Sequence, residues 1–252
     1  MSLQLEEATE KLRGILLEGR FPPGKKLREI SVAEILGVSR TIARLAMSAL
    51  EHEGLLSRER NRGSTLRAFS VSEIGDAIEV RGELEAMAAR VAAERGLSGD
   101  NLQLLNNALE SGERLLEAGI NSEDTRREWI EMNRGFHQTI IRASGNRAIE
   151  VAIRQMLTLP LVSPESFIFD LTHSELNHRQ LERSHDDHIA IVDAIESGKG
   201  HRAESLVREH AFRSAQNKRK NLSDPEALER ARSLPGGMLI VPDKLIRTRK
   251  KK

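Results

Sequence analysis

Residues 31–56 read SVAEILGVSRTIARLAMSALEHEGLL, and this stretch decides the fold of the N-terminal part of the chain. Its apolar spacing predicts a short helix that ends at Gly37 and a second helix from Arg40 to about Glu53. Ser39 is placed to cap the second helix, because its hydroxyl can accept a hydrogen bond from the first turn. Two helices joined by so short a turn predict a helix-turn-helix.

The flanking residues extend this pair to a winged helix. Before it, apolar residues at helical intervals predict a helix over residues 3–18, which the turn at Pro22-Pro23-Gly24 follows. After the second helix of the pair, residues 55–60 and 64–69 read as two short strands around a basic turn. We therefore expect residues 1–70 to form a winged helix-turn-helix DNA-binding domain.

The second helix of the pair carries polar side chains suited to DNA. Arg40, Thr41 and Arg44 lie in its first turns, the part of such a helix that enters a major groove. An Arg guanidinium matches the O6 and N7 acceptors of guanine, and a Thr can bond a phosphate or contact a thymine methyl. The opposite side is expected to pack inward through Ile42, Leu45, Ala46, Ala49 and Leu50.

The hairpin adds positive charge to this region. Arg58, Arg60 and Arg62 flank Gly63, and a wing would place these cations along DNA phosphates or in the minor groove. Residues 1–70 carry 12 Lys+Arg against 9 Asp+Glu, an excess that favours double-stranded DNA as the partner. The alternative is a solvated basic face on a small helical subdomain.

The rest of the chain is expected to be helical up to about residue 220. The periodicity and the glycine and proline breaks predict helices over 72–95, 99–118, 123–143, 146–159, 172–197 and 200–220. These make an antiparallel all-α bundle of about six helices over residues 71–220. Residues 221–252 contain three proline positions and a basic end, so we expect a loosely attached, flexible tail. Its end either adds phosphate contacts or is a frayed terminus.

Composition excludes several classes of protein. The 252 residues contain no cysteine, which excludes disulfides, thiolate nucleophiles and Cys-ligated metals, so a metal would need His, Asp, Glu or Asn. No apolar run approaches the roughly 20 residues of a membrane span, and the first residues lack a signal-peptide pattern, so we expect a cytoplasmic protein. Aromatics at 3% with no Tyr favour a mostly α fold.

Two polar residues lie on the inward face of the expected helix 123–143. Asn133 and His137 are four residues apart on its apolar stripe, so their side chains point to the same side of the helix. An amide oxygen and an imidazole in this spacing can hold one atom between them.

Two further histidines occupy mirrored positions in the last two helices of the bundle. His188 lies ten residues before Gly198, and His210 lies ten residues after Gly200. In an antiparallel helical hairpin both therefore stand at the same height above the turn, because each residue adds the same rise. We expect the two imidazoles to face each other.

Together these four residues predict a metal site. Burying several imidazoles among Leu and Ile is costly unless their nitrogens have partners, and one shared divalent ion would satisfy them all. Zinc or nickel suits such a ligand set, with Asn133, His137, His188 and His210 as ligands. The alternative is hydrogen-bonded core histidines without a metal. His185, one turn before His188, is a candidate neighbour of the site.

The N-terminal motifs are similar to those of the GntR family of regulators. Its usual order appears here over residues 8–68 as Pro23-Gly24, then Gly37-Val38-Ser39-Arg40-Thr41, then Arg44, then residues 50–56 and Gly63. The resemblance implies that the Ser39–Arg44 region and the wing contact operator DNA. The family commonly continues Pro-Val-Arg-Glu-Ala-Leu, where this chain has Ile42-Ala43-Arg44-Leu45-Ala46-Met47. Ile30 stands where an Arg is usual, with Arg28 as a substitute.

The bundle is similar to the FCD effector domain of FadR-subfamily GntR regulators over about residues 75–218. The likeness rests on residues 78–95, on Phe136-His137 followed by residues 143–146, and on His188 to His210. It implies a metal held at the four positions above, with Asn133 replacing the commoner Asp. It also implies that Arg81 pairs with an effector carboxylate, whereas an intrahelical pair with Glu85 is the alternative.

These features predict a dimeric DNA-binding transcriptional regulator whose helical domain binds a divalent metal and a small organic acid. The ligand would alter the fit of the two DNA-binding domains to operator half-sites, and we expect the protein to repress transcription. One alternative is an architectural DNA-binding protein with a purely structural bundle. Another is a metal-dependent hydrolase, which we do not favour because Asp186 and Asp187 are expected to point away from the inward face of His188.

Overall fold

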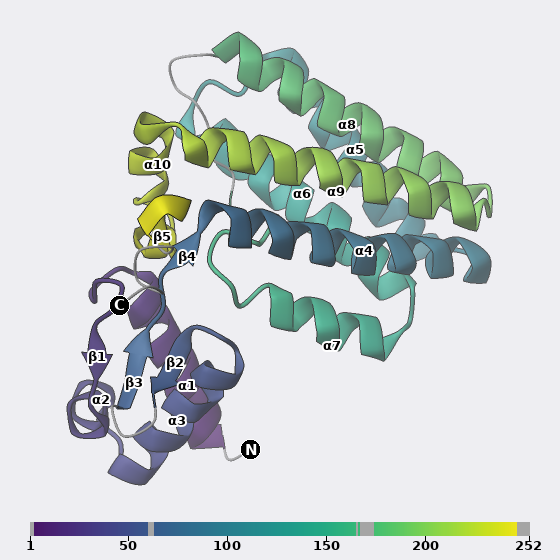
Figure 1. Ribbon diagram of the computed structural model, residues 1–252. Helices are drawn as coiled ribbons and strands as arrows, with labels where there is room; N and C mark the ends of the chain where they lie inside the picture. Colours follow the sequence, from purple (N-terminus) through teal and green to yellow (C-terminus); the bar gives the residue numbers. More distant parts are fainter. Residues whose placement is uncertain (1–2, 60–62, 165, 167–173, 246–252) are drawn as a thin grey trace. The chain divides into compact units, whose positions relative to one another are not determined.

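The computed structural model describes residues 3–59, 63–164, 166 and 174–245 (Figure 1). It divides into two compact units. The N-terminal unit comprises residues 1–74, 157–161 and 219–252, and the helical unit comprises residues 75–156 and 162–218. Among the helices that the structure describes, none combines the length and apolar character needed to cross a membrane.

The N-terminal unit contains the expected winged helix. Its helices and strands are α1 (Leu3–Leu17), β1 (Lys26–Leu27), α2 (Glu29–Leu36), α3 (Arg40–His52), β2 (Leu56–Glu59) and β3 (Gly63–Leu66). The three strands form an antiparallel sheet in the order β1-β3-β2. Its core is made of buried leucines from the helices and the sheet, among them Leu12, Leu16, Leu50, Leu55 and Leu66.

Helix α3 begins as expected but turns a different face inward. The Ser39 hydroxyl accepts a hydrogen bond from the Ile42 amide at 3.3 Å, which fixes the first turn. The buried side chains are Ala43, Ala46, Met47 and Leu50. The expectation that Leu45 packs inward is wrong, because the spacing of Ala43, Ala46 and Leu50 defines the buried stripe and leaves Leu45 45% exposed.

The expectation of a loosely attached tail is also wrong for residues 221–245. Helix α9 continues to Ser223, and α10 (Pro225–Ala231), the 3₁₀ helix η1 (Gly237–Leu239) and β5 (Ile240–Val241) follow. Strand β5 pairs in parallel with β4 (Phe69–Ser70), with Phe69 opposite Ile240. The prolines and glycines that indicated a tail instead start α10 and form the turn before η1, where Gly236 has a φ of 81°. The basic end, residues 246–252, lies outside the described residues.

The helical unit is an all-α bundle, as the periodicity predicts. Its helices are α4 (Val71–Arg95), α5 (Gly99–Ala118), α6 (Glu123–Ala143), α7 (Arg147–Met156), α8 (Ser174–Glu196) and α9 (Gly200–Ser223), the first and last of which extend into the N-terminal unit. Ser98 and Ser122 cap α5 and α6 with their hydroxyls. Helix α5 packs against α6 and α8, and the axes of α4, α8 and α9 are nearly parallel in Figure 1.

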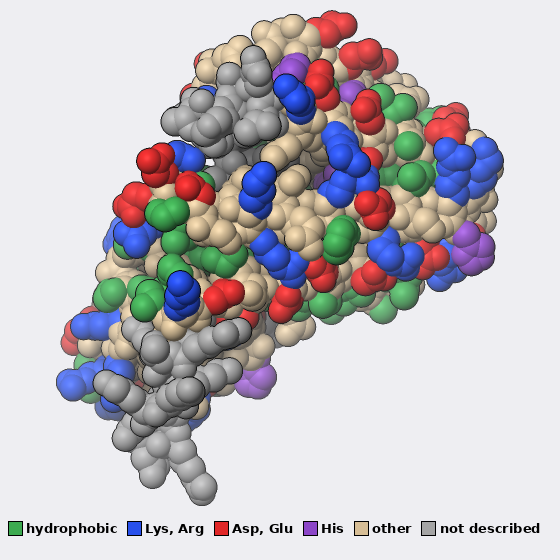
Figure 2. Space-filling model, turned by 45° about the horizontal axis from the view of Figure 1, so that its top comes forward, with side chains coloured by type: hydrophobic (Ala, Val, Ile, Leu, Met, Phe, Trp, Pro, Cys, Tyr) green, Lys and Arg blue, Asp and Glu red, His purple; other side chains and the backbone are tan. Residues whose placement is uncertain are grey.

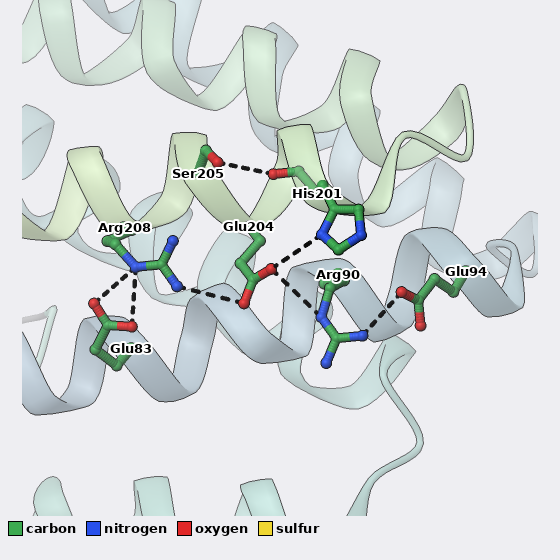
Figure 3. Close-up of polar contacts among 7 residues, drawn as sticks. All are labelled: Glu83, Arg90, Glu94, His201, Glu204, Ser205 and Arg208. Carbon is green, nitrogen blue, oxygen red and sulfur yellow. Dashed lines mark hydrogen bonds and ion pairs between the residues drawn. The ribbon is translucent and has the colours of Figure 1, made fainter.

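Helices α4 and α9 approach each other closely. A Cβ atom at Gly82 would lie 2.2 Å from the Ala211 Cβ, so only glycine fits at this crossing. Along the exposed edge of the pair, Arg208 bonds Glu83 at 2.8 Å and Arg90 lies 3.5 Å from Glu204 (Figure 3). Exposed ion pairs contribute little to the free energy of unfolding. We therefore assign these contacts between α4 and α9 a role in setting the register of the two helices.

Charged side chains of both signs are scattered over the face of the molecule shown in Figure 2. Figure 2 shows Lys and Arg interspersed with Asp and Glu over the described residues on that face, without separation into one acidic and one basic area.

Candidate metal centre and nucleic-acid interface

Three histidines from three helices converge inside the helical unit. His137 comes from α6, His188 from α8 and His210 from α9, and their ligand nitrogens all lie within 4.8 Å of one another. The three residues are 5%, 0% and 7% exposed, respectively. The mirrored positions of His188 and His210 bring their rings to a centroid separation of 4.9 Å.

His188 supplies the observation that fits a metal. Both of its ring nitrogens are buried, and neither has a hydrogen-bond partner among the described residues. Leaving a buried polar atom unpaired costs free energy, so such a residue calls for a bound partner. Burial lowers the pKa of His188 well below 6.5, and the neighbouring His210 and His137 lower it further. The neutral imidazole that results is the form that binds a divalent ion.

A buried carboxylate, Glu85, and a partly buried one, Asp187, lie against the other two imidazoles. His137 Nδ1 lies 3.0 Å from a Glu85 oxygen, and His210 Nδ1 lies 3.1 Å from an Asp187 oxygen. With Nδ1 donating to a carboxylate, the Nε2 lone pair of each ring is left for a metal, and the carboxylate fixes the ring orientation. Such pairs are the usual support of metal-binding histidines.

The sequence pattern does not indicate these two carboxylates. It predicts Glu85 only as a partner for Arg81, and it predicts that Asp187 points away from the inward face of His188. Asp187 reaches His210 on α9 and also accepts a hydrogen bond from Arg213. The antiparallel pairing of α8 and α9 was the signal that could have found Asp187, because this pairing places a residue next to His188 against α9.

Asn133 lies one turn before His137 on α6 and is 3% exposed. Its amide nitrogen donates a hydrogen bond to the Pro164 carbonyl at 3.3 Å. This leaves the amide oxygen as the atom that would face a cation, as the predicted ligand role requires.

Arg81 is buried and forms the alternative pair with Glu85. Its Nε lies 3.1 Å from a Glu85 oxygen, and its Nη1 donates to the Val162 carbonyl. Burial alone would raise the pKa of Glu85, but Arg81 and His137 outweigh burial and lower it to about 2. The result is a buried chain of contacts from Arg81 through Glu85 to His137.

The remaining histidines lie outside the cluster. His185 is 5% exposed and is the expected neighbour of the site, because its ring lies edge-on to His188 at a centroid separation of 6.4 Å and also edge-on to Trp129. His52, His178 and His201 are at the surface, as expected. His173 lies outside the described residues.

The residues expected to contact DNA form an exposed face on α3. Ser39, Arg40, Thr41 and Arg44 are all exposed, and the exposed Leu45 joins them. In the hairpin, the Arg58 side chain is 66% exposed and lies 3.8 Å from Glu51, while Gly63 has a φ of 81°. Arg60 and Arg62 lie outside the described residues. Arg28 is exposed at the start of α2.

Comparison with known protein families matches both units. The FCD domain model matches residues 76–213, and the model of bacterial regulatory proteins of the gntR family matches residues 4–66.

Curated relatives match over most of their length. The HTH-type transcriptional repressor GlaR of Escherichia coli (strain K12) is 28% identical over 79% of this chain and 88% of its own. The uncharacterized HTH-type transcriptional regulator YdhC of Bacillus subtilis (strain 168) is 27% identical over 84% of this chain and 79% of its own. The probable D-xylose utilization operon transcriptional repressor of Paenarthrobacter nicotinovorans is 26% identical over 77% and 80%.

Among solved structures, Escherichia coli McbR/YncC superposes with a TM-score of 0.59 at 22% identity, over 87% of this chain and 99% of that chain. This likeness supports the fold, a winged helix joined to a helical domain.

Proposed function

The chain belongs to the gntR family of bacterial regulatory proteins and carries an FCD domain, and from this premise we propose that it is a ligand-responsive repressor of transcription. Its relatives are transcription regulators, which removes the hydrolase alternative. Repression is proposed because GlaR and the Paenarthrobacter nicotinovorans relative are named as repressors. A protein that regulates transcription in a bacterium would work in the cytoplasm.

The exposed face of α3 would read operator DNA. Arg40 and Arg44 lie on one side of the helix at its capped start, where their guanidinium groups would reach guanine edges in a major groove. Thr41 and Leu45 would contact phosphate or thymine methyl groups. Arg58, Arg60, Arg62 and Gly63 would form the wing along the backbone. A homodimer would present two winged helices to the two half-sites of an operator.

The helical unit would be the sensor, and the unpaired nitrogens of buried His188 carry this part of the proposal. His137, His188 and His210, with the Asn133 amide oxygen, would hold a zinc or nickel ion. When bound, the metal would supply a positive centre that attracts the carboxylate of a small organic acid. Glu85 and Asp187 would orient the imidazoles, and Arg81 would bind the effector.

DNA reading is tested by fluorescence anisotropy with the DNA upstream of the protein's own gene. Wild-type protein should bind this DNA more tightly than a shuffled sequence of equal length. Arg40→Ala and Arg44→Ala should each cost about 1–3 kcal/mol and reduce the preference for the upstream sequence. Equal losses on both DNAs would instead support the architectural alternative, in which the protein contacts only the backbone.

Metal binding is tested by elemental analysis of protein purified without chelators or affinity resins that carry metal. About one ion per chain is expected for a single four-ligand site. A His188→Ala variant that remains folded by circular dichroism should lose the ion. Wild-type protein that neither retains an ion nor binds added zinc or nickel would contradict the metal assignment.

A further inference from the structure

Three donor side chains meet the backbone that follows α7. Arg81 on α4 donates to the Val162 carbonyl, Asn133 on α6 donates to the Pro164 carbonyl, and Lys218 on α9 donates to the Ser166 carbonyl. We call Val162, Pro164 and Ser166 the carbonyl trio. Two of its three donors are residues already assigned to the effector and the metal, so the third, Lys218, calls for an explanation.

Lys218 belongs to the same face of α9 as His210. The two residues are eight positions apart, which is close to two helical turns. Among the described residues no carboxylate pairs with the Lys218 ammonium group, although the side chain is half-buried. Burial and the neighbouring Arg81 cation lower the pKa of Lys218 to about 7. The two cationic side chains thus reach carbonyl groups four residues apart on one backbone segment, and Arg81 already shares its charge with Glu85.

Neutral carbonyl groups are weak partners for this pair of cations. A hydrogen bond from a cation to a carboxylate is roughly twice as strong as one between neutral groups, and it also compensates buried charge. Carbonyl and carboxylate oxygens both only accept hydrogen bonds, so a carboxylate can replace the Val162 and Ser166 carbonyls without leaving Arg81 or Lys218 unpaired.

We propose that Arg81 and Lys218 form a binding site for a carboxylate, that the carbonyl trio fills this site in the structure, and that a dicarboxylate effector displaces the trio. The inference rests on the proposed sensor function of the helical unit, and it assigns the effector to the class of small dicarboxylic acids. One acid group would occupy the site proposed above, and the other would lie between Arg81 and Lys218.

The backbone just before the carbonyl trio is suited to change conformation when the trio is displaced. Leu161 has a φ of 58° and is the only non-glycine residue with a positive φ among the described residues. This conformation is unfavourable for a side chain as large as leucine, so it is maintained by its surroundings. Residues 157–161 group with the N-terminal unit, and Val162 is the first residue of the next stretch of the helical unit. Displacing the trio would therefore act on a segment that continues into the N-terminal unit.

The site is tested with two acids that differ only in the second carboxylate. Malate carries two carboxylates, and 2-hydroxybutyrate has a methyl group in place of the distal one. Isothermal titration of zinc-loaded wild-type protein should show tighter binding of malate. Lys218→Met should weaken malate binding about tenfold, the value of one hydrogen bond to a charged group, and leave 2-hydroxybutyrate binding unchanged. Lys220→Met, an exposed lysine on the same helix, is the matched control and should behave as wild type.

The proposal is overturned if wild-type protein does not prefer malate, or if Lys218→Met weakens both acids equally or neither. Zinc titration and upstream-DNA binding on the same samples separate this failure from that of the proposed function. Protein that binds zinc and DNA but fails the malate test loses only the dicarboxylate site. Protein that binds neither loses the proposed function as well.

Displacement of the carbonyl trio has a direct readout. The chain contains no cysteine, so Ser166→Cys introduces a unique thiol. Malate should accelerate its reaction with a thiol reagent, and this acceleration should vanish when Lys218→Met is added. An unchanged or slower reaction in the presence of bound malate would contradict displacement.

Discussion

Single atoms decide the chemistry of the histidine cluster. His137 and His210 each turn Nδ1 to a carboxylate, so that their Nε2 atoms and the unpaired nitrogens of His188 are available to a metal. Sequence periodicity predicted the inward direction of these histidines, because it depends on one helix at a time. Glu85 and Asp187 could not be found in the same way, because each contact joins two different helices.

Removing the carboxylate of Glu85 tests its supporting role. Glu85→Gln should weaken zinc binding about 10- to 100-fold, because the His137 ring loses the acceptor that orients it and raises its basicity. Competition with a chromophoric chelator measures the change. Glu83→Gln, two residues earlier and exposed on the same helix, is the control. Equal zinc affinities for the two variants would contradict the role of Glu85.

The pH dependence of zinc binding follows from the direction of two pKa shifts. Burial lowers the pKa of His210 below 6.5 despite the opposing effect of Asp187, and it lowers the pKa of His188 further. A ligand imidazole must be neutral, and a lowered pKa keeps it neutral to lower pH. Zinc affinity should therefore stay nearly level from about pH 7.5 to 6.5 and fall below that range. A loss of affinity that is already complete by pH 6.5 would contradict these directions.

At the scale of helices and strands, the sequence predicted elements well where local signals act. The Ser39 cap gave the start of α3, and the glycines after α3, α5 and α8 gave the ends of these helices to within a few residues. The inward face of α3 was misjudged, because alanines rather than the larger Leu45 pack in the core. The pairing of β4 with β5 was also missed, since it joins residues 69 and 240 through strands of two residues each.

The crossing of α4 and α9 gives a prediction at this scale. Gly82→Ala should destabilise the protein by about 1–3 kcal/mol, because the new methyl group would overlap Ala211. Gly135→Ala on α6 is the matched control, since nothing lies within 4 Å of its added Cβ. That change should be neutral or stabilise by up to about 1 kcal/mol through helix propensity. Urea unfolding that ranks the two variants in the opposite order would contradict the close crossing.

The C-terminal segment gives a second prediction at the scale of helices and strands. Truncation after Arg232 removes η1 and β5, including the buried Leu239 and Ile240, and should lower the unfolding temperature. Truncation after Leu245 retains every described element and serves as the comparison. If both truncations unfolded at the same temperature, the pairing of β5 with β4 would contribute nothing to stability.

At the scale of the whole molecule, the proposed protein combines a unit that binds DNA with a unit that senses small acids. The sequence motifs and the family comparison agree on this division of labour. Coupling between the two units depends on whether a ligand favours one arrangement of the two DNA-binding units in a dimer over another. Neither unit alone determines this preference.

This coupling is tested most directly by measuring the binding of zinc-loaded protein to its upstream DNA with and without malate. Saturating malate should raise the apparent Kd for this DNA about tenfold, within the usual range of coupling between two sites. In Lys218→Met the same malate concentration should change the Kd less. An unchanged Kd, with calorimetry showing malate bound to wild-type protein, would contradict a ligand-responsive repressor.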